Sequence, residues 1–298
     1  MRVVVVGAGS IGLLIGSYLA QHKANVTFWV RREEQAIQLR EGLIRLDSMG
    51  AHDHFAVRAV VAPEELPIDA LWIIAVKYDA LPEVLLSIST LKKQPDLLFV
   101  QNGIGHVSVI DQYQLTHVSF ATVEHGAKRI DDRTVRHNGV GPITIAADER
   151  IDHMIRWLQC IDVEHFPINT HTNAEKLLLR KVIINCAINP LTAILQVRNG
   201  QLLDNVYFLQ LFNQLCDELL SNFPEMEKEL SYEDIASVCR RTASNQSSML
   251  VDRLKGKPME IETIVTAVLQ KIEQRGGHAP FLKLLESMLY GINGSEAS

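Results

Sequence analysis

The first half of the chain carries its hydrophobic residues in short continuous runs, separated by polar or glycine-rich segments. Residues 2–6, Arg-Val-Val-Val-Val, form the first of these runs. Such runs are typical of strands that are buried on both faces of a parallel sheet. Helical segments at 13–20 and 81–91 alternate with the runs, which predicts a parallel sheet covered by helices. Further strands are expected at 25–30, 69–76, 96–100, 117–122 and 143–147.

The pattern changes near residues 167–171. From about residue 173 to residue 292, long segments with helical periodicity replace the short apolar runs. We therefore predict an α/β domain over residues 1–170 and a helical domain over residues 171–298. A length of 298 residues is enough for two domains of ordinary size.

The composition narrows the classes of function. Hydrophobic residues make up 47 % and charged residues 21 %, as in soluble globular proteins. The net charge of −6 gives no basic footprint for nucleic acid. No apolar run approaches the roughly 18 to 20 residues of a membrane span, and the N-terminus shows no signal peptide. The four cysteines are scattered without paired spacing, which favours a reducing cytoplasm.

The eleven histidines show no spacing that is typical of a metal site. His52 and His54 would lie on the same face of a strand, but two histidines alone make a poor site. Because solvated loop histidines explain the pair more simply, we expect no bound metal.

A glycine motif, Gly7-Ala8-Gly9-Ser10-Ile11-Gly12, follows the first strand and opens a helix. This context is the one in which a GxGxxG sequence predicts a dinucleotide site. The first glycine allows a tight turn, the second lets the backbone approach a pyrophosphate, and the third permits close packing of helix and strand. The helix N-terminus then offers free N–H groups to the phosphates. A glycine-rich turn without a ligand is the alternative.

The residue after the second strand indicates which nucleotide binds. NAD enzymes usually place Asp or Glu there, about 20 residues after the glycines. This chain has Arg31 and Arg32, and a guanidinium would pair with a 2′-phosphate. The sequence therefore favours NADPH over NADH. Alternatively, Glu33 and Glu34 neutralise the two arginines at a solvated helix start.

Two polar residues follow buried strands of the predicted sheet. Lys77 comes after the strand that ends at Val76, and Asn102 comes after the strand that ends at Val100. Open α/β sheets bind their ligands at the carboxyl ends of the strands, so both residues are candidates for the site. Each could also be an ordinary loop residue.

The helical domain opens with a polar stripe on an otherwise apolar segment. Lys181, Asn185 and Asn189 are four residues apart, which places them on one face of a helix. Burying such groups costs free energy unless each finds a partner, and the missing partner could be a substrate. The alternative is a set of structural polar residues that pair with each other or with the backbone.

Two further candidates lie later in the helical domain. Asn245 and Ser248 are three residues apart and could share a helix face. Pro258 suggests the start of a new helix, with Glu260 in its first turn. A favourable interaction with the helix dipole would by itself explain Glu260.

Together these segments resemble the ketopantoate reductase (2-dehydropantoate 2-reductase) family nearly from end to end. The pattern Lys-x-x-x-Asn-x-x-x-Asn-Pro-Leu-Thr over residues 181–192 is highly specific, whereas the glycine loop is not. The other matching segments are the glycine loop, Val76-Lys77, Gln101-Asn102-Gly103, His125-Gly-Ala-Lys-Arg129, Asn199-Gly200, Asn245-Gln-Ser-Ser-Met-Leu250 and Met259-Glu-Ile-Glu262.

The resemblance implies a Rossmann-type N-terminal domain and an all-α C-terminal domain of the 6-phosphogluconate dehydrogenase type. It implies NADPH-dependent reduction of ketopantoate to (R)-pantoate, a step of pantothenate and coenzyme A biosynthesis, with Lys181 as the general acid. The substrate-binding residues that it implies are Asn102, Asn185, Asn189, Asn199, Asn245 and Ser248. The implied cofactor contacts beyond the glycine loop and Arg31 are Lys77, Asn102, Ala127 and Glu260.

The chain departs from the family pattern beside the site. Leu178 and Leu179 stand where the family often has a bulky aromatic residue, and Gln201 stands where it commonly has Glu. These differences leave the fit of the substrate open, since related 2-keto acid reductases share the scaffold. The alternatives are another NADP-dependent 2-keto acid reductase and a non-catalytic NADPH sensor. A homodimer through the helical domain is compatible with the sequence.

Overall fold

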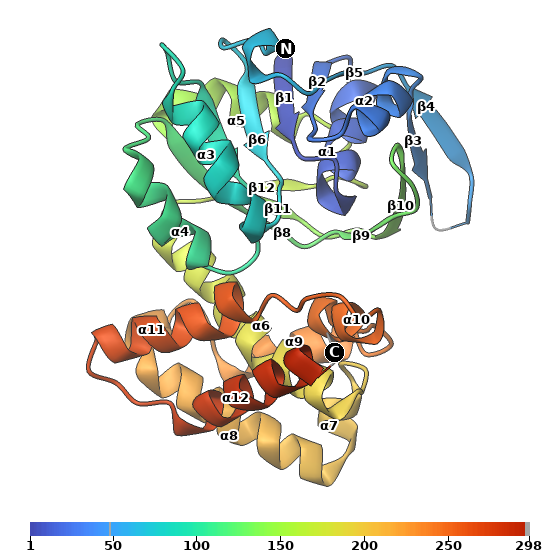
Figure 1. Cartoon of the computed structure of the whole chain (residues 1–298). Coiled ribbons are helices and arrows are strands. Elements are labelled where there is room, and N and C mark those ends of the chain that lie inside the picture. Colours follow the sequence, from blue (N-terminus) through green and yellow to red (C-terminus); the bar gives the residue numbers. More distant parts are fainter. Residues whose placement is uncertain (48, 296–298) are drawn as a thin grey trace. The chain divides into compact units, whose positions relative to one another are not determined.

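The computed structural model describes residues 1–47 and 49–295, and its contacts divide the chain into two compact units (Figure 1). The first unit contains Met1–Gln101 and His106–Leu177. The second contains Asn102–Gly105 and the chain from Leu178 onward. This division falls inside a long helix rather than at residue 170. The predicted domain boundary between residues 170 and 171 stays a prediction.

An eight-stranded sheet forms the centre of the first unit. Strand β1 (Arg2–Val6), the first strand in the chain, pairs in parallel with β2 (Asn25–Trp29) on one side and β6 (Leu71–Ile74) on the other. Only the pairing of β11 with β8 is antiparallel, so the sheet is mixed, where the sequence predicted a parallel one. In spatial order the strands are β12 (Ile168–His171), β11 (Ile143–Ala146), β8 (Val118–Val123), β7 (Asp96–Phe99), β6 (Leu71–Ile74), β1 (Arg2–Val6), β2 (Asn25–Trp29) and β5 (Arg58–Val60).

Helices cover both faces of this sheet because the side chains of its strands alternate. Val3 and Val5 of β1 belong to the core that contains α1 and α5, whereas Val4 and Val6 belong to the core that contains α3. This three-layer arrangement confirms the predicted α/β class. The helices of the first unit are α1 (Ser10–Gln21), α2 (Glu33–Arg40), α3 (Leu81–Ser89), α4 (Gly105–Ile110) and α5 (Asp152–Gln159), with 3-10 turns at Pro63–Glu65, Tyr78–Ala80, Asp111–Tyr113 and Glu149–Ile151.

A second sheet of four strands was not predicted from the sequence. The pairing of β3 with β10 is parallel, and the other two pairings are antiparallel. Figure 1 shows β9, β10, β3 and β4 beside α1 and α2. Its strands in spatial order are β4 (His52–Phe55), β3 (Leu43–Leu46), β10 (Thr134–Gly139) and β9 (Gly126–Arg129).

The second unit is helical, as predicted. Its central helix α6 (Ala174–Leu195) supplies many fully buried core residues, among them Val182, Ile183 and Cys186. The other helices are α7 (Gln201–Asp204), α8 (Val206–Asn222), α9 (Tyr232–Arg241), α10 (Ser248–Leu254), a π-helical segment (Glu262–Thr266), α11 (Ala267–Gln274) and α12 (Pro280–Ser295), with a 3-10 turn at Pro224–Met226.

Helix α6 corrects one expectation from the sequence. By length and composition it is apolar enough to cross a membrane, with 22 residues and a mean hydropathy of 1.4, although no such stretch was expected. The polar residues of its stripe had interrupted the apolar run. Because 78 % of that apolar window is buried inside the structure, α6 has the burial of a core helix.

Candidate active site

The glycine loop has the geometry that its three glycines predict. Gly7 has a φ of 97°, a left-handed conformation that favours glycine. A Cβ on Gly12 would lie 2.0 Å from the carbonyl oxygen of Gly7, so no larger residue fits there. A Cβ on Gly9 would meet no atom within 4 Å. Gly7 and Gly12 are therefore required by the turn itself, whereas Gly9 leaves an open approach to the backbone.

The start of α1 is suited to an anion. Gly9 is the N-cap residue, and no side chain caps the first turn. The first turn also contains no acidic residue. Its N–H groups and the positive end of the helix dipole can therefore serve a phosphate. The predicted set Gly7, Ala8, Gly9, Ser10, Ile11 and Gly12 fits a dinucleotide in this respect.

Two residues that the sequence did not single out as ligand contacts hold this loop from outside. Gln35 of α2 donates through Nε2 to the carbonyl oxygen of Ala8 at 3.1 Å. Arg129 of β9 donates its backbone N–H to Ser10 Oγ at 3.0 Å and its Nη1 to the Ala8 oxygen at 3.5 Å. The second sheet thus supports the loop through β9. Arg129 belongs to a motif noted in the sequence, but Gln35 had no such signal.

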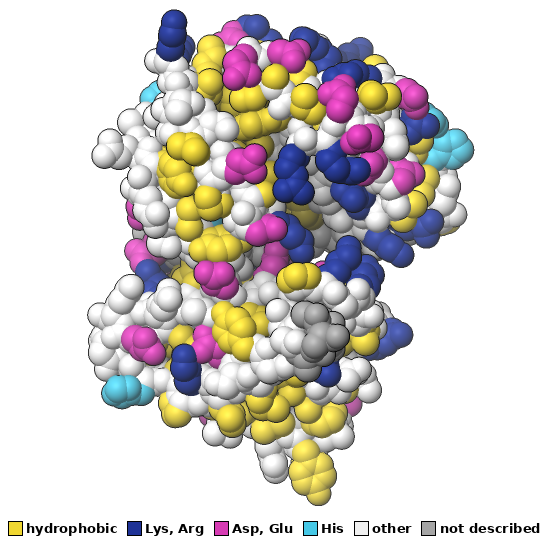
Figure 2. All heavy atoms as spheres, in the orientation of Figure 1, with side chains coloured by type: hydrophobic (Ala, Val, Ile, Leu, Met, Phe, Trp, Pro, Cys, Tyr) yellow, Lys and Arg dark blue, Asp and Glu magenta, His cyan; other side chains and the backbone are white. Residues whose placement is uncertain are grey.

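Arg31 follows β2 and is exposed, and residues 1–47 and 49–295 offer it no ion pair. Glu33 binds Arg40 instead, with 2.9 Å between Oε1 and Nη1. Arg32 binds Asp132, at 2.5 Å. Glu33 therefore does not neutralise the two arginines as the alternative supposed. Figure 2 shows dark blue basic side chains interspersed with acidic ones on the visible face of the first unit.

Lys77 and Ala127 lie on elements next to the loop. Lys77 is exposed three residues after the end of β6, at the carboxyl edge of the sheet. Ala127 is half-buried on β9, two residues before Arg129. Their roles as cofactor contacts stay predictions.

A buried chain of rings connects α1 with the start of β9. The Tyr18 hydroxyl lies 2.9 Å from His137 Nδ1, and His137 Nε2 lies 3.1 Å from His125 Nδ1. The Gly139 carbonyl can only accept, so His137 carries its proton on Nε2 and Tyr18 donates to Nδ1. The Gly141 N–H donates to His125 Nδ1, which leaves the proton of His125 on Nε2. Burial lowers the pKa of His125 to about 4.

The predicted polar stripe lies on one helix of the second unit. Lys181 and Asn185 are half-buried on α6, and Asn189 is buried with 5 % exposure. The residues between them, 182–184 and 186–188, are buried, and all of them are apolar or cysteine. Their helical spacing places an ammonium and two carboxamides on the same face. This arrangement could bind a small polar substrate and supply a proton.

Asn199 carries an unpaired acceptor. Its Nδ2 donates to Thr242 Oγ1 at 2.8 Å, and the Thr242 hydroxyl in turn donates to the Val238 carbonyl at 2.7 Å. This chain fixes the orientation of the carboxamide. Asn199 Oδ1 is buried and has no hydrogen-bond partner among the described residues. A ligand hydroxyl or a water could satisfy it.

The segment around Asn245 differs from its prediction. Asn245 lies in a loop and α10 begins only at Ser248, so the two residues do not share a helix face. The backbone N–H of Asn199 donates to the carbonyl of Asn245 at 3.1 Å, which brings this loop to Asn199. Ser247 is the buried N-cap of α10 and accepts from Thr192 of α6 at 2.7 Å. Ser248, the predicted ligand, is exposed.

Asn102 and Glu260 are brought together within the second unit. Asn102 Nδ2 lies 3.5 Å from Glu260 Oε2, at the limit of a hydrogen bond. The Ile104 N–H donates to the Thr263 carbonyl at 3.0 Å, which holds the Asn102–Gly105 loop in place. Glu260 precedes the helix, which begins at Ile261, so its predicted place in the first turn was wrong. The π-helical segment Glu262–Thr266 widens the turn here, as often occurs at functional sites.

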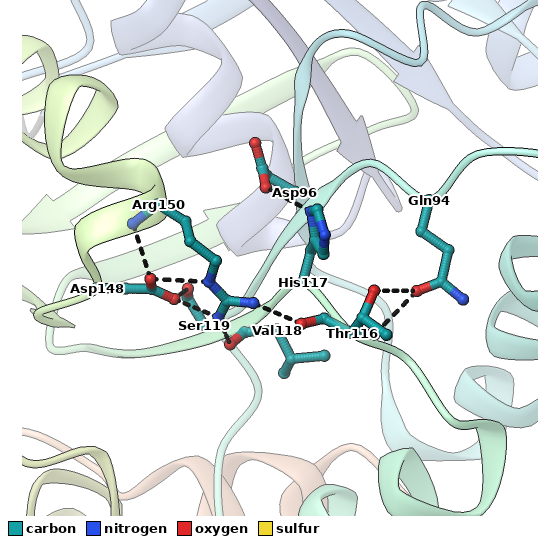
Figure 3. Close-up of polar contacts among 8 residues, drawn as sticks. All are labelled: Gln94, Asp96, Thr116, His117, Val118, Ser119, Asp148 and Arg150. Carbon is teal, nitrogen blue, oxygen red and sulfur yellow. Dashed lines mark hydrogen bonds and ion pairs between the residues drawn. The ribbon is translucent and has the colours of Figure 1, made fainter.

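A separate polar cluster surrounds Arg150 (Figure 3). Arg150 binds Asp148 and donates to the carbonyl of Val118 at 3.2 Å. Asp148 also accepts from Ser119 at 2.6 Å, and these bonds hold the pKa of the Asp148 carboxyl well below its usual range. The cluster lies at the amino end of β8, opposite the edge where parallel strands bind ligands. We therefore assign it to structure.

The two histidines of the predicted pair lie on one exposed strand. His52 and His54 lie on β4, both exposed, with ring centroids 5.4 Å apart. Among the described residues, no group of three or more His, Cys, Asp or Glu side chains could hold a metal ion.

Comparisons with known proteins match nearly the whole chain. The family model Ketopantoate reductase PanE/ApbA matches residues 3–150, and Ketopantoate reductase PanE/ApbA C terminal matches residues 173–293. The 2-dehydropantoate 2-reductase of Listeria innocua is 33 % identical, covering 99 % of this chain and 97 % of its own. That of Bacillus subtilis is also 33 % identical, covering 96 % and 95 %.

Solved structures agree with these matches. The crystal structure of panE from Bacillus subtilis has a TM-score of 0.88 at 31 % identity, covering 98 % of this chain and 100 % of its own. D-mandelate dehydrogenase with NADH and anilino(oxo)acetate has a TM-score of 0.86 at 21 % identity, covering 100 % and 99 %. The second likeness shows the fold alone.

Proposed function

The chain belongs to the ketopantoate reductase family, and from this membership we propose that it reduces ketopantoate to pantoate with NADPH. The observation that carries the proposal is the stripe of Lys181, Asn185 and Asn189 on α6. A binding protein without catalysis needs no proton donor among its ligand contacts. The stripe therefore favours an enzyme over an NADPH sensor.

The first unit would hold the cofactor. The open backbone at Gly9 and the uncapped start of α1 would receive the pyrophosphate. Arg31, which has no ion pair among the described residues, would receive the 2′-phosphate and so select NADPH. When bound, the cofactor supplies the hydride. Lys77, Ala127 and Glu260 would make further contacts with it.

The second unit would hold the keto acid and supply the proton. Lys181, as an ammonium, would stabilise the negative charge that develops on the ketone oxygen and then protonate it. Asn185 and Asn189 would orient the substrate through neutral hydrogen bonds. Asn199, with its unpaired Oδ1, would accept a hydrogen bond from the substrate hydroxyl. Asn102, Asn245 and Ser248 complete the proposed substrate contacts.

We also propose that the protein acts in the cytoplasm, in the pathway to pantothenate and coenzyme A. Cys186, Cys216 and Cys239 are buried free thiols, as expected in a reducing compartment. The structure describes a single chain, and sedimentation at assay concentration would test the proposed homodimer.

The Lys181→Ala variant tests the proposed mechanism. It should lower kcat for ketopantoate by roughly 10² to 10⁴, which is the usual contribution of a general acid. The Kd for NADPH should stay nearly unchanged, because the cofactor is held by the glycine loop. Lys176→Ala, which alters a lysine on the same helix but off the stripe, should keep the activity of the unaltered protein.

Two results would count against this assignment. An unchanged kcat in Lys181→Ala, or an equal loss of kcat and NADPH affinity, would remove Lys181 from the acid role. If the unaltered protein binds NADPH but oxidises it with none of the keto acids, the result would support a non-catalytic NADPH sensor instead.

A further inference from the structure

The carboxamide of Gln35 joins the turn between β9 and β10 to the glycine loop. Gln35 Nε2 donates both to the Ala8 carbonyl at 3.1 Å and to the Asp132 carbonyl at 3.0 Å. Gln35 is buried, with 6 % exposure, so these two bonds are shielded from water. The backbone of Asp132 is therefore held at a fixed place beside the loop.

The side chain of Asp132 lies between two arginines. Its Oδ1 lies 2.5 Å from Arg32 Nη2 and 3.8 Å from Arg129 Nη2. Arg129 also reaches the Ala8 carbonyl, and Arg32 follows Arg31 directly. The Asp132 carboxylate thus lies between Arg32 and Arg129, at the glycine loop and just beyond the end of β2. Its side chain is only 17 % exposed, whereas Arg32 and Arg129 are nearly half-exposed.

The geometry points to Asp132 as the residue that limits the preference of this site for a 2′-phosphate. This inference rests on the proposed binding of NADPH at the glycine loop. The Asp132 carboxylate forms an ion pair with the Arg32 guanidinium, so a 2′-phosphate must compete with this carboxylate for Arg32. Its negative charge also repels the phosphate across a short distance.

The Asp132 carboxylate could also accept hydrogen bonds from the ribose hydroxyls of NADH. In NAD enzymes an acidic residue accepts hydrogen bonds from the ribose hydroxyls near the end of the second strand. This chain has arginines at that point, but the fold brings Asp132 there from the second sheet. Asp132 would therefore moderate the selectivity that Arg31 creates, and the site would retain some affinity for NADH.

The Asp132→Asn variant tests this inference. The substitution removes the charge but leaves the backbone bond to Gln35, which uses the Asp132 carbonyl. We expect the Kd for adenosine 2′,5′-bisphosphate to fall by roughly threefold to fivefold, the upper part of the range that a partly exposed ion pair gives. The Kd for 5′-AMP, whose ribose hydroxyls would lose a charged acceptor, should rise instead. Titration calorimetry at physiological salt would measure both.

Glu33→Gln is the matched control. It removes the same charge from the start of α2, but Glu33 binds Arg40 rather than Arg32. Its effect on the bisphosphate should stay below about twofold, because the half-exposed Glu33 carboxylate is paired with Arg40 and screened by solvent. An equal gain in both variants would overturn the specific role of Asp132, as would unchanged or weaker binding in Asp132→Asn.

The ligand panel separates this inference from the proposed function. Unaltered protein that binds NADPH and the bisphosphate, with no tightening in Asp132→Asn, would overturn the inference alone. Unaltered protein that binds neither would overturn the proposed cofactor and the role of Asp132 together.

Discussion

Asn199 shows how a single side chain can indicate the chemistry of a ligand. Thr242 uses its only proton on the Val238 carbonyl, so it can only accept from Asn199. The oxygen of the Asn199 carboxamide is buried and has no hydrogen-bond donor among the residues that the structure describes. A buried unpaired acceptor costs about 1 to 3 kcal/mol, which a ligand hydroxyl would recover on binding.

The Asn199→Ala variant should therefore lose selectivity for the hydroxylated substrate. We expect kcat/KM for ketopantoate to fall by about tenfold or more, the effect of losing one buried hydrogen bond. The value for trimethylpyruvate, which has the same carbon skeleton without the hydroxyl, should change little. Steady-state rates with both keto acids measure the difference. An equal fall for the two substrates would show that Asn199 does not read the hydroxyl.

Sequence alone indicated some residues of the candidate site and not others, for a physical reason. Lys181, Asn185 and Asn189 were found because they are neighbours on one helix, and helical spacing is visible in the sequence. Gln35 and Asp132 were not found, because their contacts join residues that are distant along the chain. The N-cap role of Ser247 was not predicted, because the sequence does not fix the start of α10 to one residue.

At the scale of elements, the glycine loop makes a sharp prediction. Gly9 has a φ of −81°, which alanine adopts freely, and its Cβ would meet no atom within 4 Å. Gly9→Ala should therefore fold with an unchanged Tm but lose NADPH affinity, because the methyl group occupies the approach of the pyrophosphate. Thermal unfolding and NADPH titration of the same sample test this. Unchanged NADPH affinity would mean that the pyrophosphate binds elsewhere.

Gly12→Ala is the contrasting variant in the same loop. Its Cβ would lie 2.0 Å from the Gly7 carbonyl oxygen, so the turn has to shift. We expect a loss of both stability and cofactor affinity, with a fall of roughly 1 to 3 kcal/mol in the free energy of unfolding, as for overpacking elsewhere. Denaturant unfolding measures it. A Gly12→Ala protein as stable as Gly9→Ala would contradict the packing described.

Strands with a continuous run of apolar residues were predicted from the sequence, and a strand without such a run was not. Strands β1, β2, β6 and β7 are buried on both faces and were predicted from their apolar runs. Strand β4, His-Asp-His-Phe, is largely exposed and carries no apolar run. The antiparallel pairing of β11 with β8 was also hidden, since the strand direction within a sheet leaves no mark on a short buried run.

At the scale of the whole molecule, buried histidines predict sensitivity to acid in the first unit. His106 is 1 % exposed, stacks on Phe99, and has no partner for either ring nitrogen among the described residues. Burial lowers the pKa of His106 to about 4, and burial first, with His137 second, lowers that of His125 to about 4. An unfolded histidine titrates near ~6.5, so the unfolded chain binds more protons than the folded one between these values.

Stability should therefore fall as the pH drops from about 6.5 to about 4, by roughly 2 kcal/mol per buried histidine at pH 5. Denaturant unfolding at pH 7 and pH 5 measures the change. Asp148 contributes at lower pH. Because its pKa is lowered in the folded protein, the stability that it contributes is lost only as the pH falls below the ordinary pKa of an aspartate.

The His106→Phe variant isolates one of these histidines. Phenylalanine keeps the stacking and removes both unpaired nitrogens, so it should raise stability and reduce the loss between pH 7 and pH 5. His153→Phe, at an exposed position on α5, should leave the pH dependence unchanged. An unaltered pH dependence in His106→Phe would show that His106 does not titrate as its burial predicts.

The central claim is the reduction of ketopantoate by NADPH, and the loss of NADPH absorbance with purified protein tests it most directly. The assay would compare ketopantoate with trimethylpyruvate and other plain 2-keto acids, each with NADPH and with NADH. We predict rapid oxidation of NADPH with ketopantoate and much slower oxidation in every other combination. Faster oxidation with a plain 2-keto acid would contradict the assigned substrate, and no oxidation with any of them would contradict the assignment of an enzyme.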